Sequence, residues 1–424
     1  MNLDLEAGQG IQVTGPAKVR IIDGELSLLG IDVSSNQEFI VKSGKQYPFE
    51  AKSQSKLELI GTDLQYIISE EPLIPPDRKT AAQRIGFIPT PARIMVLGQM
   101  DTGKSTVVCY LANHFLNQGK RVAVLDLDMG QQDIGPPCTI TLGLLNNPIL
   151  KLSDIPLNRM VFIGKTSPIG RMLQILTGAR ELVDHALNVA DIILIDTTGW
   201  VFGGAARAYK AAKIRTLEPD VLVALEKEDE IEHLLKPFQS VILVEKLSVY
   251  PHIELRNSKT RKFLRESKFN NYFKNAVSRT LDLRFLTFEN TFFRSGKRLL
   301  EAEWNKVEKT LECDFIYAEK AVDAIFLVKR SSSFYNKDKI KQLRGDYRVN
   351  EIRIIDKNDK KGLIVGLLDE KLKTLGIGLI ENISYESDTI RIFTPVKEDI
   401  KVLQYGFLKI TKTGQEILDQ NLSF

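Results

Sequence analysis

The middle of the chain alternates short, continuously apolar runs with amphipathic segments. The apolar runs read RIMVLG, VAVLDLD, DIILID and DVLVALE, and helical periodicity covers residues 104–116 and 172–190. Strands that are apolar on both faces need cover on both sides, as in a parallel sheet packed between helices. The pattern therefore predicts a doubly covered α/β domain from about residue 93 onwards.

The two ends of the chain have a different pattern. Residues 11–69 run as short β-type segments such as AKVRII and KLELIG, separated by Gly, Asn, Asp and Ser. The proline-rich stretch EEPLIPPDRKT, residues 70–80, resists helix and strand alike and is interpreted as a linker. Beyond residue 283, β-like pieces lie among lysine-rich turns. We predict an N-terminal β domain (1–75), a central P-loop domain with a parallel sheet (81–282) and a mainly β C-terminal domain (283–424).

Composition narrows the functional classes only a little. The 424 residues are 43% hydrophobic and 26% charged, with a net charge of +4, which is ordinary for a globular protein and a weak argument for an anionic partner. Three cysteines form no CxxC pair, no apolar window is long enough to span a bilayer, and the first residues do not resemble a signal peptide. We expect a cytoplasmic protein without membrane contact.

One segment carries a specific chemistry. The string GQMDTGKST follows the apolar run RIMVL and precedes a helical run. In such a loop, backbone N–H groups and a helix N-terminus surround a triphosphate, a lysine adds a point charge, and a hydroxyl ligates Mg²⁺. A chance glycine-rich turn does not account for this placement between strand and helix. The candidate nucleotide-binding residues are Gly98, Asp101, Thr102, Gly103, Lys104, Ser105 and Thr106, with Ser105 as a metal ligand.

Carboxylates follow two of the predicted strands. Asp126 and Asp128 come at the end of VAVLDLD, and the carboxyl ends of parallel strands face the ligand. One would hold hydrated Mg²⁺ and the other would accept a proton from an attacking hydroxyl; Asp128 is the better candidate, because Asp126 also suits a cap or turn. Asp196 ends DIILID, where many P-loop proteins carry a magnesium-linked aspartate, and the sequence leaves its contact with the metal open.

A basic stretch supplies mobile cations. In KTRKFLRESKFNNYF, residues Arg261, Arg265 and Lys268 recur on one helical face. Such a face suits phosphoryl transfer, which needs charge stabilisation around the migrating group, although many charged faces are merely solvated. Trp200, in a glycine-flanked loop after a strand, suits either stacking on a nucleobase or packing within the protein.

Together these motifs resemble the polynucleotide 5′-hydroxyl kinase family, which includes mRNA 3′-processing, ribosomal RNA processing and archaeal members. The resemblance rests on GQMDTGKST, DLDMGQQDIGPPCTI, GKTSPIG, DTTGWVFGGA, KIRTLEPD and TRKFLRESKFNNYF, with VTGPAKVRI similar to the family's N-terminal β domain. It covers about residues 93–275, and the C-terminal third matches loosely. Two departures are Gln99, where relatives often have proline, and Cys138, where glycine often follows the proline.

The resemblance implies magnesium-dependent transfer of the ATP γ-phosphate to the 5′-OH end of RNA, and in some members DNA. It implies a phosphate-binding and catalytic role for Lys104 and places Asp128 with Gln131 near the 5′-hydroxyl. It also implies catalytic lid arginines, Arg261 and Arg265. The TxGW element, with Thr197, Gly199 and Trp200, would bind the substrate end.

Two other functions are compatible with a P-loop. A GTPase or ATPase assembly factor shares this core, since the loop does not identify the phosphate acceptor. The nearest string to an NKxD guanine-recognition tetrad is NKDK at residues 336–339, which has lysine where aspartate is needed. A non-catalytic ATP-binding scaffold of an RNA-processing complex is the second alternative, and retention of Lys104, Asp128 and the lid arginines favours an enzyme.

Overall fold

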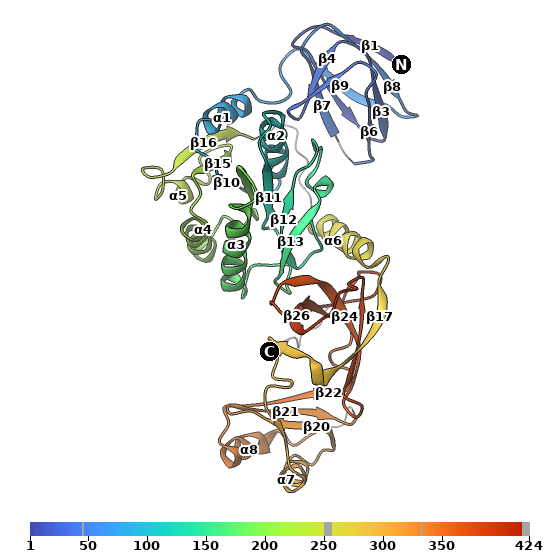
Figure 1. The fold of residues 1–424 in the computed structure, drawn as a ribbon, viewed down its shortest axis with the longest axis vertical. Coiled ribbons are helices and arrows are strands. Elements are labelled where there is room, and N and C mark those ends of the chain that lie inside the picture. Colours follow the sequence, from blue (N-terminus) through green and yellow to red (C-terminus); the bar gives the residue numbers. More distant parts are fainter. Residues whose placement is uncertain (45, 250–256, 332–333, 418–424) are drawn as a thin grey trace.

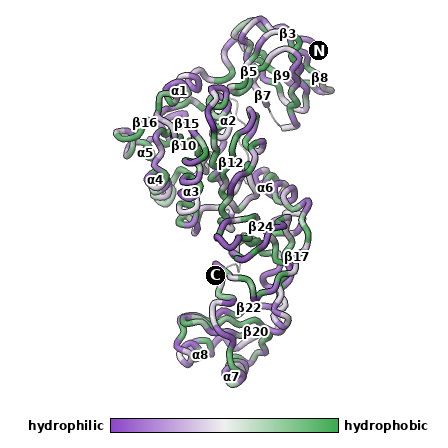
Figure 2. Tube along the Cα trace, in the orientation of Figure 1, coloured by the Kyte–Doolittle hydropathy of each residue, from purple (hydrophilic) through white to green (hydrophobic). Residues whose placement is uncertain are grey.

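The computed structural model describes residues 1–44, 46–249, 257–331 and 334–417 and shows an elongated chain of successive domains (Figure 1). The N-terminal β domain is at one end, the P-loop domain follows, and the C-terminal β-rich region extends to the other end. Hydrophobic and hydrophilic positions are mixed along the whole trace rather than segregated in one part (Figure 2). Each region also has a buried apolar core of its own.

The N-terminal domain packs a four-stranded sheet, β1-β8-β3-β6, against a five-stranded sheet, β5-β4-β7-β2-β9. Buried and more exposed positions alternate along β7 and β8, as expected for strands with one face on a core. The strands are β1 (Asn2–Leu5), β2 (Gly10–Thr14), β3 (Ala17–Asp23), β4 (Glu25–Leu28), β5 (Ile31–Ser34), β6 (Glu38–Val41), β7 (Gln46–Ala51), β8 (Ser55–Ile60) and β9 (Gln65–Ser69). The prediction of a small β domain is confirmed.

The predicted linker is shorter than the sequence suggested, because helix α1 (Asp77–Ile85) begins inside it. Pro76 precedes the first helical residue, where a fixed φ and a missing N–H are tolerated, and Asp77 lies in the positive first turn. The Asp77 carboxylate accepts hydrogen bonds of 2.8 Å from the backbone N–H and the hydroxyl of Ser248. The expectation that residues 77–80 resist helix formation was wrong, since prolines at a helix start do not exclude the helix that follows.

The central sheet has the order β13-β12-β11-β14-β10-β15-β16. The four predicted strands are parallel, β16 adds a fifth parallel strand, and β12 and β13 add an antiparallel edge. Separate apolar cores lie on the two faces of the sheet. Its strands are β10 (Ala92–Gly98), β11 (Val122–Asp126), β12 (Thr139–Leu144), β13 (Leu157–Phe162), β14 (Ile192–Asp196), β15 (Val221–Glu226) and β16 (Leu243–Ser248).

Helices connect these strands and cover the sheet. Helix α2 belongs to one core, whereas α3 and α4 belong to the other. The helical segment predicted for residues 172–190 ends at Ala186. The helices of this domain are α2 (Lys104–Asn117), α3 (Met172–Ala186), α4 (Gly204–Leu217) and α5 (Glu232–Leu235). No helix in the described ranges has the length and apolar character needed to cross a bilayer.

Helix α6 (Ser258–Phe273) lies between the P-loop domain and the C-terminal region (Figure 1). Its apolar residues Phe269 and Phe273 are buried in a cluster with Phe162 of β13 and strands of the C-terminal sheet. A side chain at Gly366 would collide with the Phe162 ring, and one at Gly406 would collide with Ile364 and press on that ring, so close approach requires glycine at both positions. This shared cluster joins the two regions.

The C-terminal region contains a larger sheet, β17-β25-β24-β23-β26-β18 with β27 at its side, and a smaller sheet, β19-β20-β21-β22, covered by two helices. Strand β17 lies inside the predicted central domain (81–282) but pairs with β25 of the larger C-terminal sheet. The predicted domain boundary at 282/283 stays a prediction. The elements are β17 (Val277–Asp282), β18 (Thr287–Glu289), β19 (Lys297–Arg298), α7 (Glu301–Leu311), β20 (Phe315–Lys320), β21 (Ala324–Lys329), α8 (Ile340–Tyr347), β22 (Glu351–Asp356), β23 (Leu363–Leu368), β24 (Thr374–Ser384), β25 (Thr389–Thr394), β26 (Val402–Ile410) and β27 (Glu416–Ile417).

Candidate nucleotide and phosphoryl-transfer site

The phosphate-binding loop connects β10 to α2. Gly103 has a φ of 89°, the left-handed conformation that glycine adopts without strain, and directly precedes Lys104 at the helix start. A side chain at Gly98 would collide with the Thr102 hydroxyl and the Leu225 carbonyl. The Thr102 hydroxyl donates a 3.0 Å hydrogen bond to the Gln99 carbonyl. The loop is therefore held in a turn that leads into the helix N-terminus, as a bound triphosphate requires.

Lys104 is buried within this loop. Its ammonium group donates a short hydrogen bond to the carbonyl of Gln99. Burial lowers the pKa of Lys104, and the carboxylates of Asp196, Asp128 and Asp101 oppose that shift. A cation surrounded by carboxylates and held by a single carbonyl is ready to exchange that carbonyl for phosphate oxygens.

Ser105 and Asp196 form a pair at the end of the loop. The Ser105 hydroxyl donates a 2.7 Å hydrogen bond to Asp196, whose other oxygen accepts from the Thr197 N–H. Burial raises the pKa of Asp196 to about 6, against the influence of Lys104 and Ser105. A hydroxyl next to a carboxylate beside the phosphate loop is a donor set that fits hydrated Mg²⁺.

Asp126 and Gln132 hold the loop that follows β11. The two carboxylate oxygens of Asp126 accept the backbone N–H groups of Asp128 (2.9 Å) and Asp133 (2.7 Å). The buried Gln132 amide bridges the carbonyls of Asp126 and Thr139. Burial, with Asp196 nearby, raises the pKa of Asp126 well above its usual range. These contacts correspond to the cap role that the sequence left open for Asp126, whose contact with a metal stays a prediction.

Asp128 lies beyond the end of β11 rather than in it. One of its oxygens accepts the N–H groups of Gly130 and Gln131 at 3.1 and 3.0 Å. The side chain is half-buried, and Gln131 reaches from the same loop to the carbonyl of Arg261 in α6. Asp128 thus combines a fixed orientation with access from outside, which suits a group that receives a proton.

The segment Thr197–Trp200 packs directly on the phosphate loop. The Thr197 hydroxyl donates to the carbonyl of Val96 in β10 at 2.8 Å. A side chain at Gly199 would lie within 2.4 Å of the Met100 backbone, so this approach requires glycine. Trp200 is half-buried against Tyr209, with ring centres 6.1 Å apart. That contact corresponds to the packing alternative; nucleobase stacking by Trp200 stays a prediction.

Two lysines of α4 contribute to this segment, and the sequence analysis did not single them out. Lys210 and Lys213 are completely buried. The Lys210 ammonium donates to the Thr197 hydroxyl (3.0 Å) and the Thr198 carbonyl (2.6 Å). Burial lowers the pKa of both, that of Lys213 to about 8. Their spacing of three residues on an amphipathic helix was the available signal, since it places both on one face.

Helix α6 brings cations to the phosphate loop and to the loop that follows β11. Arg261 makes a 2.8 Å ion pair with Asp101 of the phosphate loop, whose φ is 55°. Lys268 contacts Asp133 and the Gln131 carbonyl at 2.7 and 2.9 Å. Arg265 pairs instead with Glu416 of β27. The predicted basic face is therefore engaged with carboxylates, and Arg261 is the arginine that reaches the phosphate loop.

Cys138, where the resembled family often has glycine, has a left-handed backbone conformation. Cys138 follows two prolines, is fully buried and has a φ of 68°. This left-handed conformation is costly for most residues and cheap for glycine, which explains why glycine suits the position. The Cys138 side chain packs in the apolar cluster that joins β13, α6 and the C-terminal sheet.

Comparisons with known proteins agree with this architecture. Residues 98–275 match the family described as mRNA cleavage and polyadenylation factor CLP1 P-loop. A polyribonucleotide 5′-hydroxyl-kinase of Methanocaldococcus jannaschii is 33% identical, over 81% of this chain and 94% of its own length. One from Pyrococcus horikoshii is 30% identical, over 84% and 96%.

The solved structure of wild-type Clp1p in complex with Pcf11p has a similar fold, with a TM-score of 0.64 and 12% identity over 96% of this chain and 97% of that one. The similarity extends over all three regions of the chain, including the C-terminal third that the sequence motifs matched only loosely.

Proposed function

The chain belongs to the polyribonucleotide 5′-hydroxyl-kinase family, and we propose that it transfers the γ-phosphate of ATP to the 5′-hydroxyl end of RNA. The observation that carries this proposal is the grouping of Lys104 and Ser105 with Asp196 and Asp128 under the cations of α6. Phosphoryl transfer depends on positioning and charge stabilisation, and this arrangement supplies both.

In the proposed reaction the loop at Gly103 binds the triphosphate through its backbone N–H groups. Ser105 and Asp196 would hold Mg²⁺, which when bound would neutralise charge on the phosphates. Lys104 exchanges the Gln99 carbonyl for phosphate oxygens, and Arg261 leaves Asp101 to neutralise charge on the migrating group. Asp128 accepts the proton of the 5′-hydroxyl as the hydroxyl oxygen forms a bond to the γ-phosphorus; the bond from that phosphorus to the β–γ bridging oxygen breaks, and ADP leaves.

The remaining residues would position the substrate. Lys210 fixes the Thr197–Trp200 segment, so that Thr197 and Gly199 lie against the phosphate loop. Gln131 links the Asp128 loop to α6 and would face the substrate end. We propose RNA as the main acceptor, DNA as a second one, and an enzyme of the cytoplasm that works with RNA-processing partners, by analogy with the Clp1p–Pcf11p complex.

One assay distinguishes this function from its alternatives. The protein is incubated with Mg²⁺, γ-labelled ATP and matched oligoribonucleotides that carry either a 5′-OH or a 5′-phosphate. We expect label only on the 5′-OH strand, and a deoxy version measures the second acceptor class. Phosphate release without labelled RNA would indicate an ATPase or GTPase instead, and tight ATP binding without turnover would indicate a scaffold.

A further inference from the structure

A second concentration of positive charge lies far from the phosphate loop, on helix α8 at the end of the molecule opposite the N-terminal β domain (Figure 1). Lys337, Lys341, Arg344 and Arg348 are spaced by four, three and four residues, which places them along one face of the helix and its flanking turns. All four are exposed. We call these four residues the α8 stripe.

The charge of the stripe is not compensated locally. Residues 330–348 include six basic and two acidic residues, a net charge of +4, which equals that of the whole chain. Of the two acids, Asp346 is paired with Lys306 on α7 at 2.9 Å. Within the described ranges, no salt bridge involves any of the four stripe residues. The stripe is therefore a surface where cations gather without carboxylate partners.

The opposite face of α8 is anchored. Leu343 and Tyr347 are buried in the core formed by α7, α8 and the smaller sheet, and the Tyr347 hydroxyl donates to the Glu303 carbonyl at 3.0 Å. These contacts fix which way the helix faces. The face of α8 that carries the stripe is therefore held towards solvent.

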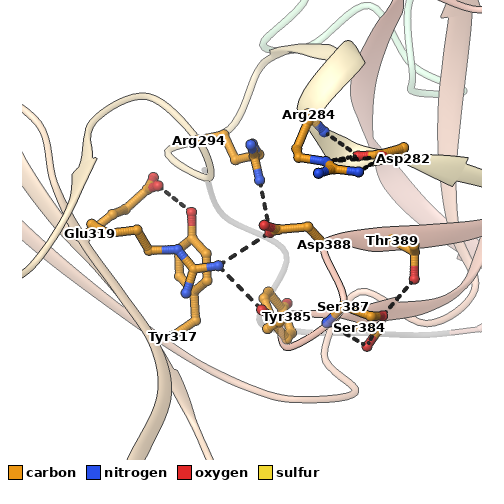
Figure 3. A network of polar contacts seen from close by, with 11 residues as sticks. Asp282, Arg284, Arg294, Tyr317, Glu319, Ser384, Tyr385, Ser387, Asp388 and Thr389 are labelled. Atoms are coloured by element: carbon orange, nitrogen blue, oxygen red, sulfur yellow. Dashed lines mark hydrogen bonds and ion pairs between the residues drawn. The ribbon is translucent and has the colours of Figure 1, made fainter.

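A polar network anchors the smaller sheet to the larger one (Figure 3). Asp388, next to β25, accepts from Arg294 (3.1 Å) and Arg298 (3.3 Å), and Arg298 also donates to the Tyr385 carbonyl. The Arg298 guanidinium stacks on Tyr317, whose hydroxyl donates to the buried Glu319 at 2.5 Å. The stripe is thus carried at a set position relative to the larger sheet and, through it, to α6.

We propose that the α8 stripe binds the sugar–phosphate backbone of the RNA substrate, downstream of the 5′ end that is phosphorylated. The inference rests on the proposed function, because it names a second contact for the same substrate. Rows of Lys and Arg that neutralise successive phosphates are the usual source of sequence-independent affinity for nucleic acid.

The composition of this surface favours RNA over a protein partner. Helix α8 exposes Gln342 and Gly345 between the cations and no large apolar side chain. Protein interfaces depend on clustered aromatic and apolar anchors, and the exposed positions of α8 itself offer none. Phe334, almost fully exposed just before the stripe, offers a ring on which a base can stack.

The test compares a short and a long 5′-OH oligoribonucleotide with the same 5′ sequence. Single-strand sites cover about 4–16 nucleotides, so lengths of about 5 and about 40 separate the catalytic site from a distant one. The variant changes all four stripe residues to glutamine. We expect its KM for the long RNA to rise about tenfold at low salt and the slope of log affinity against log salt to become less steep by about 2–3.

A matched variant removes four other exposed lysines of the C-terminal region that make no salt bridge within its described residues: Lys309, Lys371, Lys373 and Lys397. This control should leave the KM for long RNA within about twofold of the parent, since general charge is screened within about 10 Å at 0.1 M salt.

Turnover on the short RNA should be unchanged in both variants, so a failure of the kinase function itself would be recognised separately. Unaltered affinity and salt slope for long RNA in the stripe variant would overturn the proposal and leave the surface to an acidic protein partner. An equal loss in both variants would also overturn it, because the effect would then be one of net charge.

Discussion

The cations around the phosphate loop and those of the α8 stripe are the same residue types in opposite situations. Lys104, Arg261 and Lys268 are held by a carbonyl or by carboxylates in half-buried or buried surroundings. Lys341 and Arg344 of the stripe extend into solvent. Charges in a low-dielectric site act strongly and over fixed distances, whereas exposed ones are weakened by water and salt.

The comparison teaches that counting basic residues does not locate function. At the loop, each cation already has a partner that a ligand must replace, so its removal should affect the rate of reaction. At the stripe, the cations make no salt bridge within the described part of the chain, so their removal should affect affinity for a polyanion and its salt dependence. The predictions below test this division, in order of decreasing effect.

The largest effect is expected for Lys104→Ala. Loss of the buried cation beside the phosphates should lower kcat by about 10³–10⁵, because electrostatic stabilisation in such sites is worth several kcal/mol. The far-ultraviolet circular dichroism and the melting temperature should stay close to those of the parent. Turnover within tenfold of the parent would show that the loop does not bind the reacting phosphate.

Substitutions of the two lid arginines should have different effects, because the two side chains pair with different carboxylates. Arg261→Gln should lower kcat by about 10²–10³, since Arg261 lies at the phosphate loop. Arg265→Gln should lower kcat less and reduce thermal stability, because its partner Glu416 belongs to the C-terminal sheet. Single-turnover rates and melting curves measure both. Equal losses of rate would indicate that Arg265 also reaches the reacting groups.

Asp128→Asn tests the proton acceptor. The amide keeps the size of the side chain and can still accept from Gly130 and Gln131, but it cannot take the proton. We expect kcat to fall by about 10²-fold with KM for ATP nearly unchanged. A drop in ATP affinity with kcat preserved would assign Asp128 to nucleotide binding instead.

The buried Lys213 predicts a pH-dependent stability that an exposed lysine would not show. Burial lowers its pKa to about 8 in the folded chain, against about 10.4 when unfolded. Between these values the unfolded state binds more protons, so stability should rise as pH increases from about 8 to 10.4, by up to about 3 kcal/mol. Thermal denaturation across this range measures it. Lys213→Met should reduce the rise and leave the part that the buried Lys210 contributes, whereas the exposed control Lys236→Met should keep it in full.

The smallest effect is expected for Trp200→Ala. Stacking on a base is worth about 1–3 kcal/mol, and Trp200 already shares its surface with Tyr209. If it contacts the substrate, KM for the oligoribonucleotide should rise about fivefold to tenfold while KM for ATP stays constant. A fall in melting temperature with both KM values unchanged would assign Trp200 to packing alone.

The sequence by itself determined the phosphate loop, four of the parallel strands of the P-loop domain and the helices α2 and α3. Apolar runs and the glycine-lysine loop are local signals, because a strand buried on both faces and a helix start depend on neighbouring residues. The same signals placed Asp128 and Asp196 at one edge of the sheet.

Only the tertiary structure decided which partners these residues meet. Arg261 reaches Asp101 across 160 positions of sequence and Arg265 reaches Glu416 across 151, and no local pattern encodes such pairs. What packs beside each element likewise decides the antiparallel edge β12–β13, the burial of Lys210 and Lys213, and the lack of salt bridges on the described face of α8. Charge and polarity are properties of single residues, whereas burial and pairing arise only when distant segments pack together. Burial and pairing set the strength of each interaction.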